Sequence, residues 1–507
     1  FSDNVNNPAE DMSQFSTLVN LQRQYFESGE PATLKARKTA LLTLKKILTE
    51  ESSKITEAVY KDLRRLPGTT HALEIANSIV EIDYFLENLE EWMSPTYVEK
   101  TLTTALDTPM IQKQAKGVVL IVSPWNYPVS MITLPLIGIL GAGNTVIIKP
   151  SELSPHTAQV FDDLFTKYFD KRFIAVVQGG VSETTDLLKE RFDHIMYTGC
   201  TPVGKIIMTA AAKHLTPVTL ELGGKCPVVV ESDADIAIST KRIAWGKWLN
   251  CGQTCLAPDY ILTTPQLKSK VISGLTSAIK EFYGDNIQKS KDYSRIINQR
   301  HFDRINSLLE KTKAKMIFNG GETDRDDLFI PPIILDVERG DIVMEDEIFG
   351  PILPILTVTD LDDAITVIRG GEKPLAAYLF TRDEKKVAKF LDETTSGGVT
   401  INDVLMHITV DTLPFGGVGY SGLGRYRGKF GFDTFTHERA VLKRGFFGEQ
   451  LAAARYPPST PAKEKSMKQL TGTRRPVPKV LRTYLPTIPY LLVGILIGFL
   501  LNKYSVR

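Results

Sequence analysis

The stretch WLNCGQTCLAPDY, Trp248–Tyr260, holds Cys251 and Cys255, two of the chain's four cysteines. Two thiols four residues apart could form half of a metal site, a redox pair, or a nucleophile beside a structural neighbour. A zinc site needs two more ligands, and no cysteine or histidine cluster with zinc spacing is visible in the sequence. A disulfide-exchange pair more usually has two residues between its cysteines. The spacing alone leaves open a nucleophile beside a neighbour or two small buried residues, with a zinc or redox module as a further alternative.

Four short apolar runs precede this stretch and predict the sheet that would position it. They are GVVLIVS, NTVIIKP, FIAVVQGG and HIMYTG, which begin at Gly117, Asn144, Phe173 and His194. Continuous apolar runs separated by helical stretches predict a parallel sheet that is covered on both faces. Each run ends in a turn that contains proline or glycine. Ligands bind outside the carboxyl ends of such strands, so we expect the site at these turns.

Composition sets broad limits on the class of protein. A chain of 507 residues predicts at least two large domains. Its 43% hydrophobic and 23% charged residues are typical of a folded enzyme, and its net charge of +1 argues against a nucleic-acid-binding protein. Four cysteines are too few for a disulfide framework and fit a reducing compartment.

The C-terminal segment from Leu485 to Leu501 has no charged residue. A helix of this length would span roughly 25 Å, close to the hydrocarbon core of a bilayer. The preceding segment KEKSMKQLTGTRRPVPKVLR is basic and suits anionic headgroups. We expect a transmembrane tail anchor with the remaining chain facing the cytosol, and the alternative is a buried hydrophobic helix. Gly494 and Gly498 have the spacing of a helix-pairing motif.

Five motifs together carry a family resemblance: PWNYP from Pro124, KPSE from Lys149, ELGGK from Glu221, GQTCLAP from Gly252 and EIFGP from Glu347. At these spacings the chain resembles the aldehyde dehydrogenase superfamily over roughly residues 15–445. The segments MTAAAKHLTPVTLELGGK and RIAWGKWLNCGQTCLAPDYIL resemble its class 3 branch, and the apolar tail is similar to that of the membrane-bound fatty aldehyde enzymes.

The resemblance implies an α/β fold with a Rossmann-like NAD-binding domain and a second α/β catalytic domain. We expect residues 1–223 to hold N-terminal helices and the NAD-binding domain, with part of the oligomerisation segment near 98–115. Residues 224–412 would form the catalytic domain and 413–445 a return segment with an oligomerisation strand. Within the latter, the sequence FDTFTHERAVLKR, Phe432–Arg444, indicates a short extended segment. Residues 446–484 would form a basic linker and 485–501 the anchor. The family also implies a homodimer.

The resemblance assigns three catalytic roles. Cys255 aligns with the nucleophile, whose thiolate adds to an aldehyde and gives a thioester that water can hydrolyse. Cys251 matches no required cysteine of the family and is interpreted as a packed bystander. Asn126 resembles the side-chain donor to the oxyanion, together with the backbone N–H of Cys255. Glu221 fits the base that activates water, because partial desolvation raises the pKa of a carboxylate.

The resemblance also implies a cofactor site for NAD and no metal. Gly199 and Gly204 would lie at the helix start that receives the diphosphate, and Cys200 replaces the serine or asparagine often found beside them. Lys149 and Glu152 look like the ribose-binding pair, and a carboxylate there favours NAD over NADP. The remaining expected contacts are Glu347 with the nicotinamide ribose, Phe349 and Trp125 near the cofactor, and Tyr127 and Phe415 in the substrate funnel. His407 and Asn402 are interpreted as structural residues.

These expectations point to NAD-dependent oxidation of medium- and long-chain fatty aldehydes to acids at a membrane. The family favours the endoplasmic reticulum, whereas a short anchor with basic flanks suits the mitochondrial outer membrane; a peroxisome or lipid droplet is also compatible. Two alternatives use the same fold. One is a CoA-acylating or reductive enzyme that passes the acyl group to another acceptor. The other is a non-catalytic NAD-binding membrane scaffold, which would be expected to lose Cys255, Asn126 or Glu221.

Overall fold

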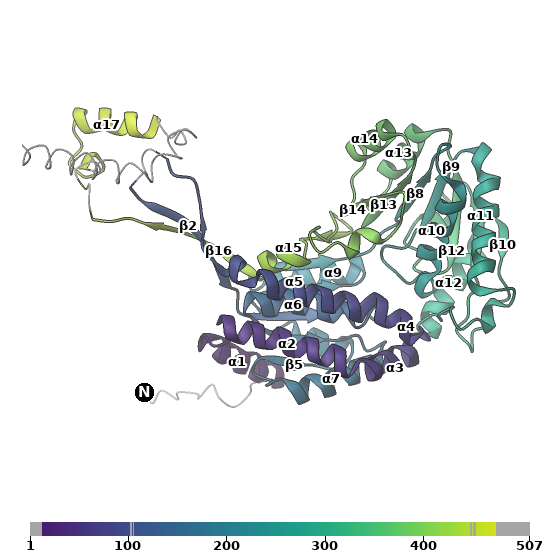
Figure 1. Ribbon diagram of the computed structural model, residues 1–507, viewed down its shortest axis with the longest axis horizontal. Coiled ribbons are helices and arrows are strands. Elements are labelled where there is room, and N and C mark those ends of the chain that lie inside the picture. The colour runs from purple at the N-terminus through teal and green to yellow at the C-terminus, as the bar shows by residue number, and fades with distance from the viewer. Residues whose placement is uncertain (1–12, 102–103, 105, 447–448, 450–452, 473–507) are drawn as a thin grey trace, which may run out of the picture. The chain divides into compact units, whose positions relative to one another are not determined.

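The computed structural model describes residues 13–101, 104, 106–446, 449 and 453–472 (Figure 1). One compact unit comprises the chain up to Glu90 and Ala115–His437, and it contains two large sheets. The first sheet has the order β15 (Gly422–Leu423), β7 (Val218–Glu221), β6 (His194–Thr198), β3 (Val118–Val122), β4 (Thr145–Lys149) and β5 (Ile174–Val176). All its neighbouring strands are parallel except β15, which is antiparallel to β7.

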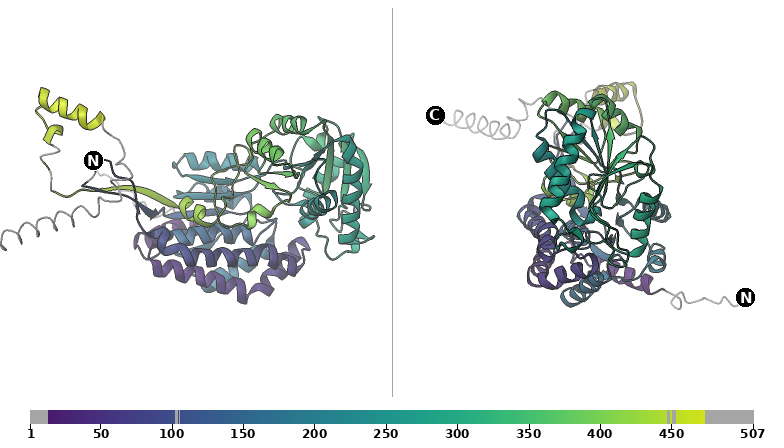
Figure 2. Two further views of the ribbon diagram at one scale, coloured as in Figure 1. Left: turned by 45° about the horizontal axis from the view of Figure 1, so that its top comes forward. Right: turned by 90° about the vertical axis from the view of Figure 1, so that its right-hand side faces the viewer.

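Both faces of this six-stranded sheet are buried. Val118 and Leu120 of β3 lie in one apolar cluster with residues of the first helix and of the helix that follows β6. Val119 and Ile121, whose side chains alternate with them along the strand, are buried as well. Helices therefore cover the sheet on both sides, as Figure 2 shows. This arrangement confirms the predicted parallel-sheet α/β fold.

The helices around this sheet come mainly from the N-terminal half of the chain. They are α1 (Gln14–Glu27), α2 (Leu34–Glu50), α3 (Ser52–Leu63), α4 (Pro67–Thr70), α5 (Ala76–Met93), α6 (Ser130–Ala142), α7 (Pro155–Tyr168), α8 (Val181–Leu187), α9 (Thr201–Ala212) and α15 (Gly428–Thr434), with a π-helical turn at His71–Ile75 between α4 and α5. Every residue of α6 is buried, as expected of a helix that is apolar all round. It packs against β3, β4, α2 and α15 and thus fixes the loop that leads into it.

The second sheet of this unit has seven strands. Its order is β10 (Lys315–Asn319), β11 (Ile333–Val337), β12 (Ile352–Thr357), β9 (Tyr260–Thr263), β8 (Pro227–Val230), β13 (Ala376–Phe380) and β14 (Gly398–Ile401), and only β10 runs antiparallel to its neighbour. Its helices are α10 (Ile236–Trp248), α11 (Pro265–Tyr283), α12 (Gln299–Lys311), α13 (Leu361–Gly370) and α14 (Glu384–Glu393), with 3₁₀ turns at Leu249–Gly252, Ile287–Lys289, Ile342–Met344 and Met406–Thr409. Buried aliphatic residues fill the central strands, as in other parallel sheets.

A second unit comprises Glu91–Gln114 and the chain from Glu438. It holds nearly all of a three-stranded sheet, whose order is β1 (Thr96–Tyr97), β2 (Thr108–Ala115) and β16 (Thr436–Lys443). Within this unit, Arg444 donates two hydrogen bonds to Asp107, of 2.9 and 2.6 Å. A 3₁₀ turn at Ala453–Arg455 and helix α17 (Pro461–Gly472) follow. Helix α17 lies in the segment predicted as a linker.

The segment from Phe432 to Arg444, expected to be extended, is partly helical. Helix α15 ends at Thr434 and only then does β16 begin. The helix starts at Gly428, whose backbone N–H donates to the Glu81 carboxylate at 2.7 Å. It then packs on α6 where Gly431 faces Gly138, since a Cβ built on Gly431 lies 3.8 Å from the Gly138 Cα. Tertiary packing between two glycines outweighs the local extended pattern here.

No helix within the described ranges is both long and apolar enough to cross a membrane. The predicted anchor, Leu485–Leu501, and the Gly494 and Gly498 pair lie outside the described residues.

Candidate active site

A cavity of about 1130 Å³ opens at the carboxyl ends of the strands of the first sheet. It is the place that the parallel topology predicts for a ligand. The structure brings nine of the predicted site residues to its walls: Trp125, Asn126, Tyr127, Gly199, Glu221, Cys255, Glu347, Phe349 and Phe415. Three others, Lys149, Glu152 and Gly204, are not among the lining residues.

The turn before Cys255 has an uncommon backbone. Asn250, Cys251 and Gly252 have φ values of 51°, 55° and 74°, so three successive residues occupy the left-handed region. Such a conformation costs a non-glycine residue roughly 1–3 kcal/mol and persists only where the surroundings fix it. At Gly252 a Cβ would lie 2.2 Å from the Gly350 carbonyl oxygen, which explains the glycine. The turn reverses the chain between α10 and the cavity and presents Cys255 there.

Cys255 has surroundings that hold its thiol protonated. Burial is the main cause, the carboxylates of Glu347 and Glu221 act in the same direction, and together they raise the pKa of Cys255 to about 12. Hydrogen bonds from the backbone N–H groups of Cys255 and Leu256 oppose this shift. The same N–H groups are thus near the sulfur, where they can also stabilise an oxygen anion formed beside it.

The other cysteines of this region have structural surroundings. Cys251 is fully buried, its Sγ lies 3.5 Å from the Tyr293 hydroxyl, and burial raises its pKa to about 12. Cys226 is fully buried and its thiol donates to the Cys255 carbonyl at 3.3 Å. Among the residues that the structure describes, no group of three or more histidine, cysteine or acidic side chains could hold a metal ion.

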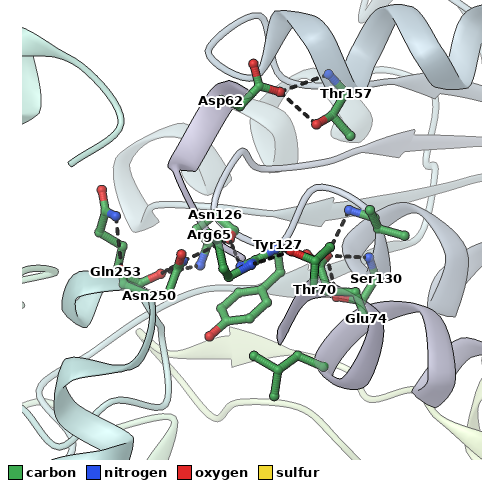
Figure 3. A network of polar contacts seen from close by, with 12 residues as sticks. Asp62, Arg65, Thr70, Glu74, Asn126, Tyr127, Ser130, Thr157, Asn250 and Gln253 are labelled. Carbon is green, nitrogen blue, oxygen red and sulfur yellow. Dashed lines mark hydrogen bonds and ion pairs between the residues drawn. The ribbon is translucent and has the colours of Figure 1, made fainter. Parts of the chain in front are cut away.

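Asn126 lies in the loop between β3 and α6. Its Nδ2 donates to the Gln253 carbonyl at 3.0 Å, and its own carbonyl accepts from Asn250 Nδ2 at 3.0 Å. These two bonds join the loop of Asn126 to the turn of Cys255 (Figure 3). An amide nitrogen has two hydrogens, so the second one is available for an oxygen bound in the cavity. The neighbouring Tyr127 hydroxyl lies 2.9 Å from Thr254 Oγ1, one residue from the nucleophile.

Glu221 ends β7 and is only 2% exposed. Neither of its carboxylate oxygens has a hydrogen-bond partner among the described residues. Burial raises its pKa well above the ordinary value. A buried carboxylate without a partner is costly in a folded protein and is often found where chemistry requires a base. The backbone of Glu221 is fixed, because its carbonyl accepts from the Gly199 N–H at 2.9 Å.

The turn after β6 has the form of a diphosphate site. Cys200 is the N-cap residue of α9, it is exposed, and its side chain makes no capping hydrogen bond. A Cβ on Gly199 would lie 2.2 Å from the Tyr197 hydroxyl, and a Cβ on Gly223 would lie 2.0 Å from Glu347 Oε2. These glycines leave a bare backbone on the cavity wall beside a helix N-terminus, which fits an extended anionic cofactor such as a dinucleotide.

Gly204 and the pair Lys149 and Glu152 lie behind that wall. A Cβ on Gly204 would lie 2.9 Å from Leu222 Cδ2, so this glycine lets α9 pack against the end of β7. Lys149 is buried, and its ammonium donates to the Pro150 carbonyl at 2.6 Å and lies 3.8 Å from the Glu152 carboxylate. The Glu152 side chain is 47% exposed and is therefore free to meet a ligand from solvent.

Glu347 and Phe349 also line the cavity. Burial, and then the charge of Asp259, raise the pKa of Glu347 to about 8. The ring of Phe349 contacts Trp125 edge to face at a centroid distance of 5.5 Å, and Trp125 also contacts His301 at 5.1 Å. Trp125 thus joins the loop before α6 to the Phe349 segment.

Several polar residues near the cavity were not found by sequence analysis. Arg65, Glu74 and Thr254 are buried and bonded to the loop of Asn126 or its neighbours. The Tyr426 hydroxyl is buried without a partner in the described part of the chain, and the Glu221 carboxylate contributes to its raised pKa. Thr254 stands in the motif GQTCLAP but had no role assigned to it. The other three belong to no motif, so only the fold could place them here.

His407 and Asn402 have contacts that suit their predicted structural role. The ring of His407 bonds to Thr400 Oγ1 at 2.9 Å, and burial lowers its pKa to about 4. The side chain of Asn402, at φ 60°, accepts from the Thr381 N–H and donates to the Thr381 carbonyl, both at 2.9 Å.

Comparison with known proteins identifies the family. The family model described as "Aldehyde dehydrogenase family" matches residues 6–441. The chain belongs to the aldehyde dehydrogenase family. It is 49% identical to mouse "Aldehyde dehydrogenase family 3 member A2", over 87% of this chain and 91% of that protein. It is 48% identical to mouse "Aldehyde dehydrogenase, dimeric NADP-preferring", over 89% of this chain and 99% of that protein.

Solved structures of aldehyde dehydrogenases agree with this assignment. The substrate-bound Staphylococcus aureus enzyme AldH superposes with a TM-score of 0.88 at 41% identity, covering 91% of this chain and all of that one. These matches confirm the resemblance to the family and to its class 3 branch. The protein is an aldehyde dehydrogenase, and the family uses NAD or NADP as electron acceptor.

Proposed function

We propose that this enzyme oxidises medium- and long-chain fatty aldehydes to fatty acids with NAD, while anchored to a membrane. One observation supports the chemistry above all: a single cavity holds a thiol, an amide donor and a buried carboxylate that has no hydrogen-bond partner among the described residues. These are the three groups that thioester-mediated aldehyde oxidation requires.

In the proposed mechanism the Cys255 thiol gives its proton to solvent water, and its sulfur forms a bond to the aldehyde carbon. The carbonyl oxygen becomes an anion, which the Asn126 amide and the Cys255 backbone N–H stabilise. NAD, when bound, would be the two-electron oxidant that accepts the hydrogen of the former aldehyde carbon together with its electron pair, which leaves a thioester on Cys255. Glu221 then takes a proton from water, whose oxygen attacks the thioester carbon. The C–S bond breaks, the acid leaves, and Glu221 returns the proton to the sulfur.

We assign the residues that would hold NAD from the family resemblance, and Lys149 and Glu152 on that ground alone, because they do not line the cavity. The Gly199 turn and the start of α9 face the diphosphate, Lys149 and Glu152 the adenosine ribose, and Glu347 the nicotinamide ribose, with Phe349 and Trp125 beside it. Gly204 serves by packing, because it brings α9 close to β7. The exposed Cys200 thiol is a weak hydrogen-bond donor, so backbone groups contribute most at this turn.

The walls of the cavity support an apolar substrate. Leu73, Met131, Leu134, Met406, Ile408 and Phe415 line it, together with Tyr127. Each methylene group that leaves water gains about 0.8 kcal/mol, so a hydrocarbon chain is favoured over a polar one. The sequence of the tail, Leu485–Leu501, would hold the enzyme at a bilayer where such aldehydes dissolve, on the cytosolic side of the endoplasmic reticulum or mitochondrial outer membrane. A relative is named dimeric, which supports a homodimer.

The test of this proposal is NADH formation with aldehydes from four to sixteen carbons, for the full chain and for one truncated after residue 480. We expect kcat/KM to rise up to about fourfold per added methylene until the cavity is filled, since 0.8 kcal/mol corresponds to that factor. Truncation should leave hexanal oxidation unchanged and slow the oxidation of hexadecanal presented in vesicles. Equal kcat/KM at all chain lengths would rule out the fatty aldehyde assignment. NADH formation only with added CoA, with acyl-CoA as the product in place of the acid, would favour the acylating alternative.

The choice between NAD and NADP gives a second prediction. Glu152→Gln should raise kcat/KM for NADP relative to NAD by about five- to tenfold, because it removes roughly 1 kcal/mol of repulsion toward a 2′-phosphate. Steady-state kinetics with both cofactors measures this ratio. Asp186→Asn, at an exposed acid paired with Lys189, is the matched control and should leave the ratio unchanged. A Glu152→Gln variant with the original ratio would exclude Glu152 from the ribose site.

A further inference from the structure

Arg65 and Glu74 form an ion pair that is almost completely removed from solvent. Their side chains are 1% and 0% exposed. Arg65 follows α3 and Glu74 lies in the π-helical turn His71–Ile75. Neither residue lines the active-site cavity, so neither can touch a substrate or cofactor there. Burial lowers the pKa of Arg65 to about 10, and the guanidinium stays charged at neutral pH.

Arg65 contacts the loop of Asn126 directly. Its Nη1 donates to the Asn126 carbonyl at 3.1 Å, its Nε donates to Thr70 Oγ1 at 3.2 Å, and its guanidinium lies 4.8 Å from the centroid of the Tyr127 ring (Figure 3). One side chain therefore fixes the backbone at Asn126 and the ring of the next residue.

Glu74 fixes the other end of the same loop. Its Oε2 accepts from the backbone N–H groups of Val129 and Ser130 at 2.9 and 2.8 Å, and from Ser130 Oγ at 3.2 Å. Val129 is the N-cap residue of α6 and has no side-chain cap of its own. A carboxylate from another element thus accepts hydrogen bonds from N–H groups at the start of α6, and its negative charge interacts favourably with the positive end of the helix dipole.

From these contacts we propose that the Arg65–Glu74 pair is a positioning device that holds Asn126 in register with Cys255, a role that rests on the proposed oxyanion function of Asn126. The Asn126 carbonyl oxygen accepts one hydrogen bond from Arg65 and one from Asn250 Nδ2. The ion pair therefore acts on the loop of Asn126 and on the turn before Cys255 together. A buried ion pair adds little net stability compared with well-packed apolar residues. The contribution of the ion pair is the set of directed hydrogen bonds to the loop, which two apolar side chains could not form.

A double-mutant cycle tests the proposal. Arg65→Met should lower kcat by roughly 10- to 100-fold, a part of the 10²- to 10³-fold effect of losing an oxyanion donor. The KM values for NAD and aldehyde should change less than about twofold. In an Asn126→Ala background the same change should lower kcat by less than about threefold, because the group that it positions is already gone. An equal loss of kcat in both backgrounds would overturn the inference.

Two further variants separate positioning from stability. The double variant Arg65→Met with Glu74→Gln keeps an oxygen acceptor for α6 and leaves no buried charge, so Tm should recover while kcat stays low. Recovery of both Tm and kcat would overturn the proposal. If Arg65→Met alone does not fold, this double variant replaces it in the cycle. Arg23→Met is the matched control: it breaks the pair with Asp193 (2.7 Å) at the amino end of β6, and should lower Tm without changing kcat. If Asn126→Ala alone retained full kcat, the proposed function of Asn126 would fail instead.

Discussion

The Cys255→Ser variant is expected to lose aldehyde oxidation by about 10⁴-fold or more in kcat. A serine hydroxyl is a far weaker nucleophile than a thiolate. Among the residues that the structure describes, no basic side chain is hydrogen-bonded to the Cys255 side chain to activate it as in a serine hydrolase. The carboxylates of Glu221 and Glu347 already oppose ionisation at this position. NADH formation measures the loss, and fluorescence titration with NADH should show unchanged cofactor binding.

Cys251→Ala is the matched control for this prediction. Cys251 packs against the Tyr293 hydroxyl in the left-handed turn before Cys255, so the substitution removes a small buried group and should cost about 1 kcal/mol of stability. Turnover should stay within about threefold of the original. Full activity in Cys255→Ser, or a folded but inactive Cys251→Ala, would show that Cys255 is not the nucleophile.

The layout of the cavity followed from the sequence because its residues lie at strand ends. Asn126 follows β3 and Gly199 follows β6, and apolar runs predicted both strands. Parallel strands bring their carboxyl ends to one edge, so strand prediction alone places these two residues together. No run predicted β7, and Glu221 at its end was identified by the motif ELGGK. The motif of Cys255 then supplied the nucleophile from the second sheet.

Other features depended on long-range contacts and had no local signal. Arg65 and Glu74 come from a helical region some 50 to 60 residues before the loop that they hold, and in sequence they look like solvated charges. Likewise α15 is held where Gly428 bonds to Glu81 and Gly431 meets Gly138, whereas the sequence from Phe432 onward indicated extended chain. Side chains whose partners lie far along the chain become visible only when the fold is known.

The Glu221→Gln variant should stop the second half of the reaction and spare the first. Without a base for the hydrolytic water, steady-state turnover should fall by roughly 10²- to 10⁴-fold. Formation of the thioester needs only Cys255, Asn126 and the cofactor, so stopped-flow mixing should show a burst of about one NADH per active site. Mass spectrometry of the quenched enzyme should find an acyl group on Cys255. Loss of the burst together with turnover would mean that Glu221 acts on the nucleophile.

The pH dependence of the same variant has a defined sign. The pKa of Glu221 is raised well above 4.5, so hydrolysis by the native enzyme should increase as pH rises through that pKa and Glu221 becomes a base; Glu221→Gln should lack this increase. The carboxylate also raises the pKa of Cys255, so removing its charge favours the thiolate. Alkylation of Cys255 by iodoacetamide at pH 9 should therefore be faster in Glu221→Gln, even though turnover is slower. If Glu221→Gln slowed alkylation and turnover equally, the substitution would have distorted the site in general. If it changed neither reaction, Glu221 would be excluded as the base.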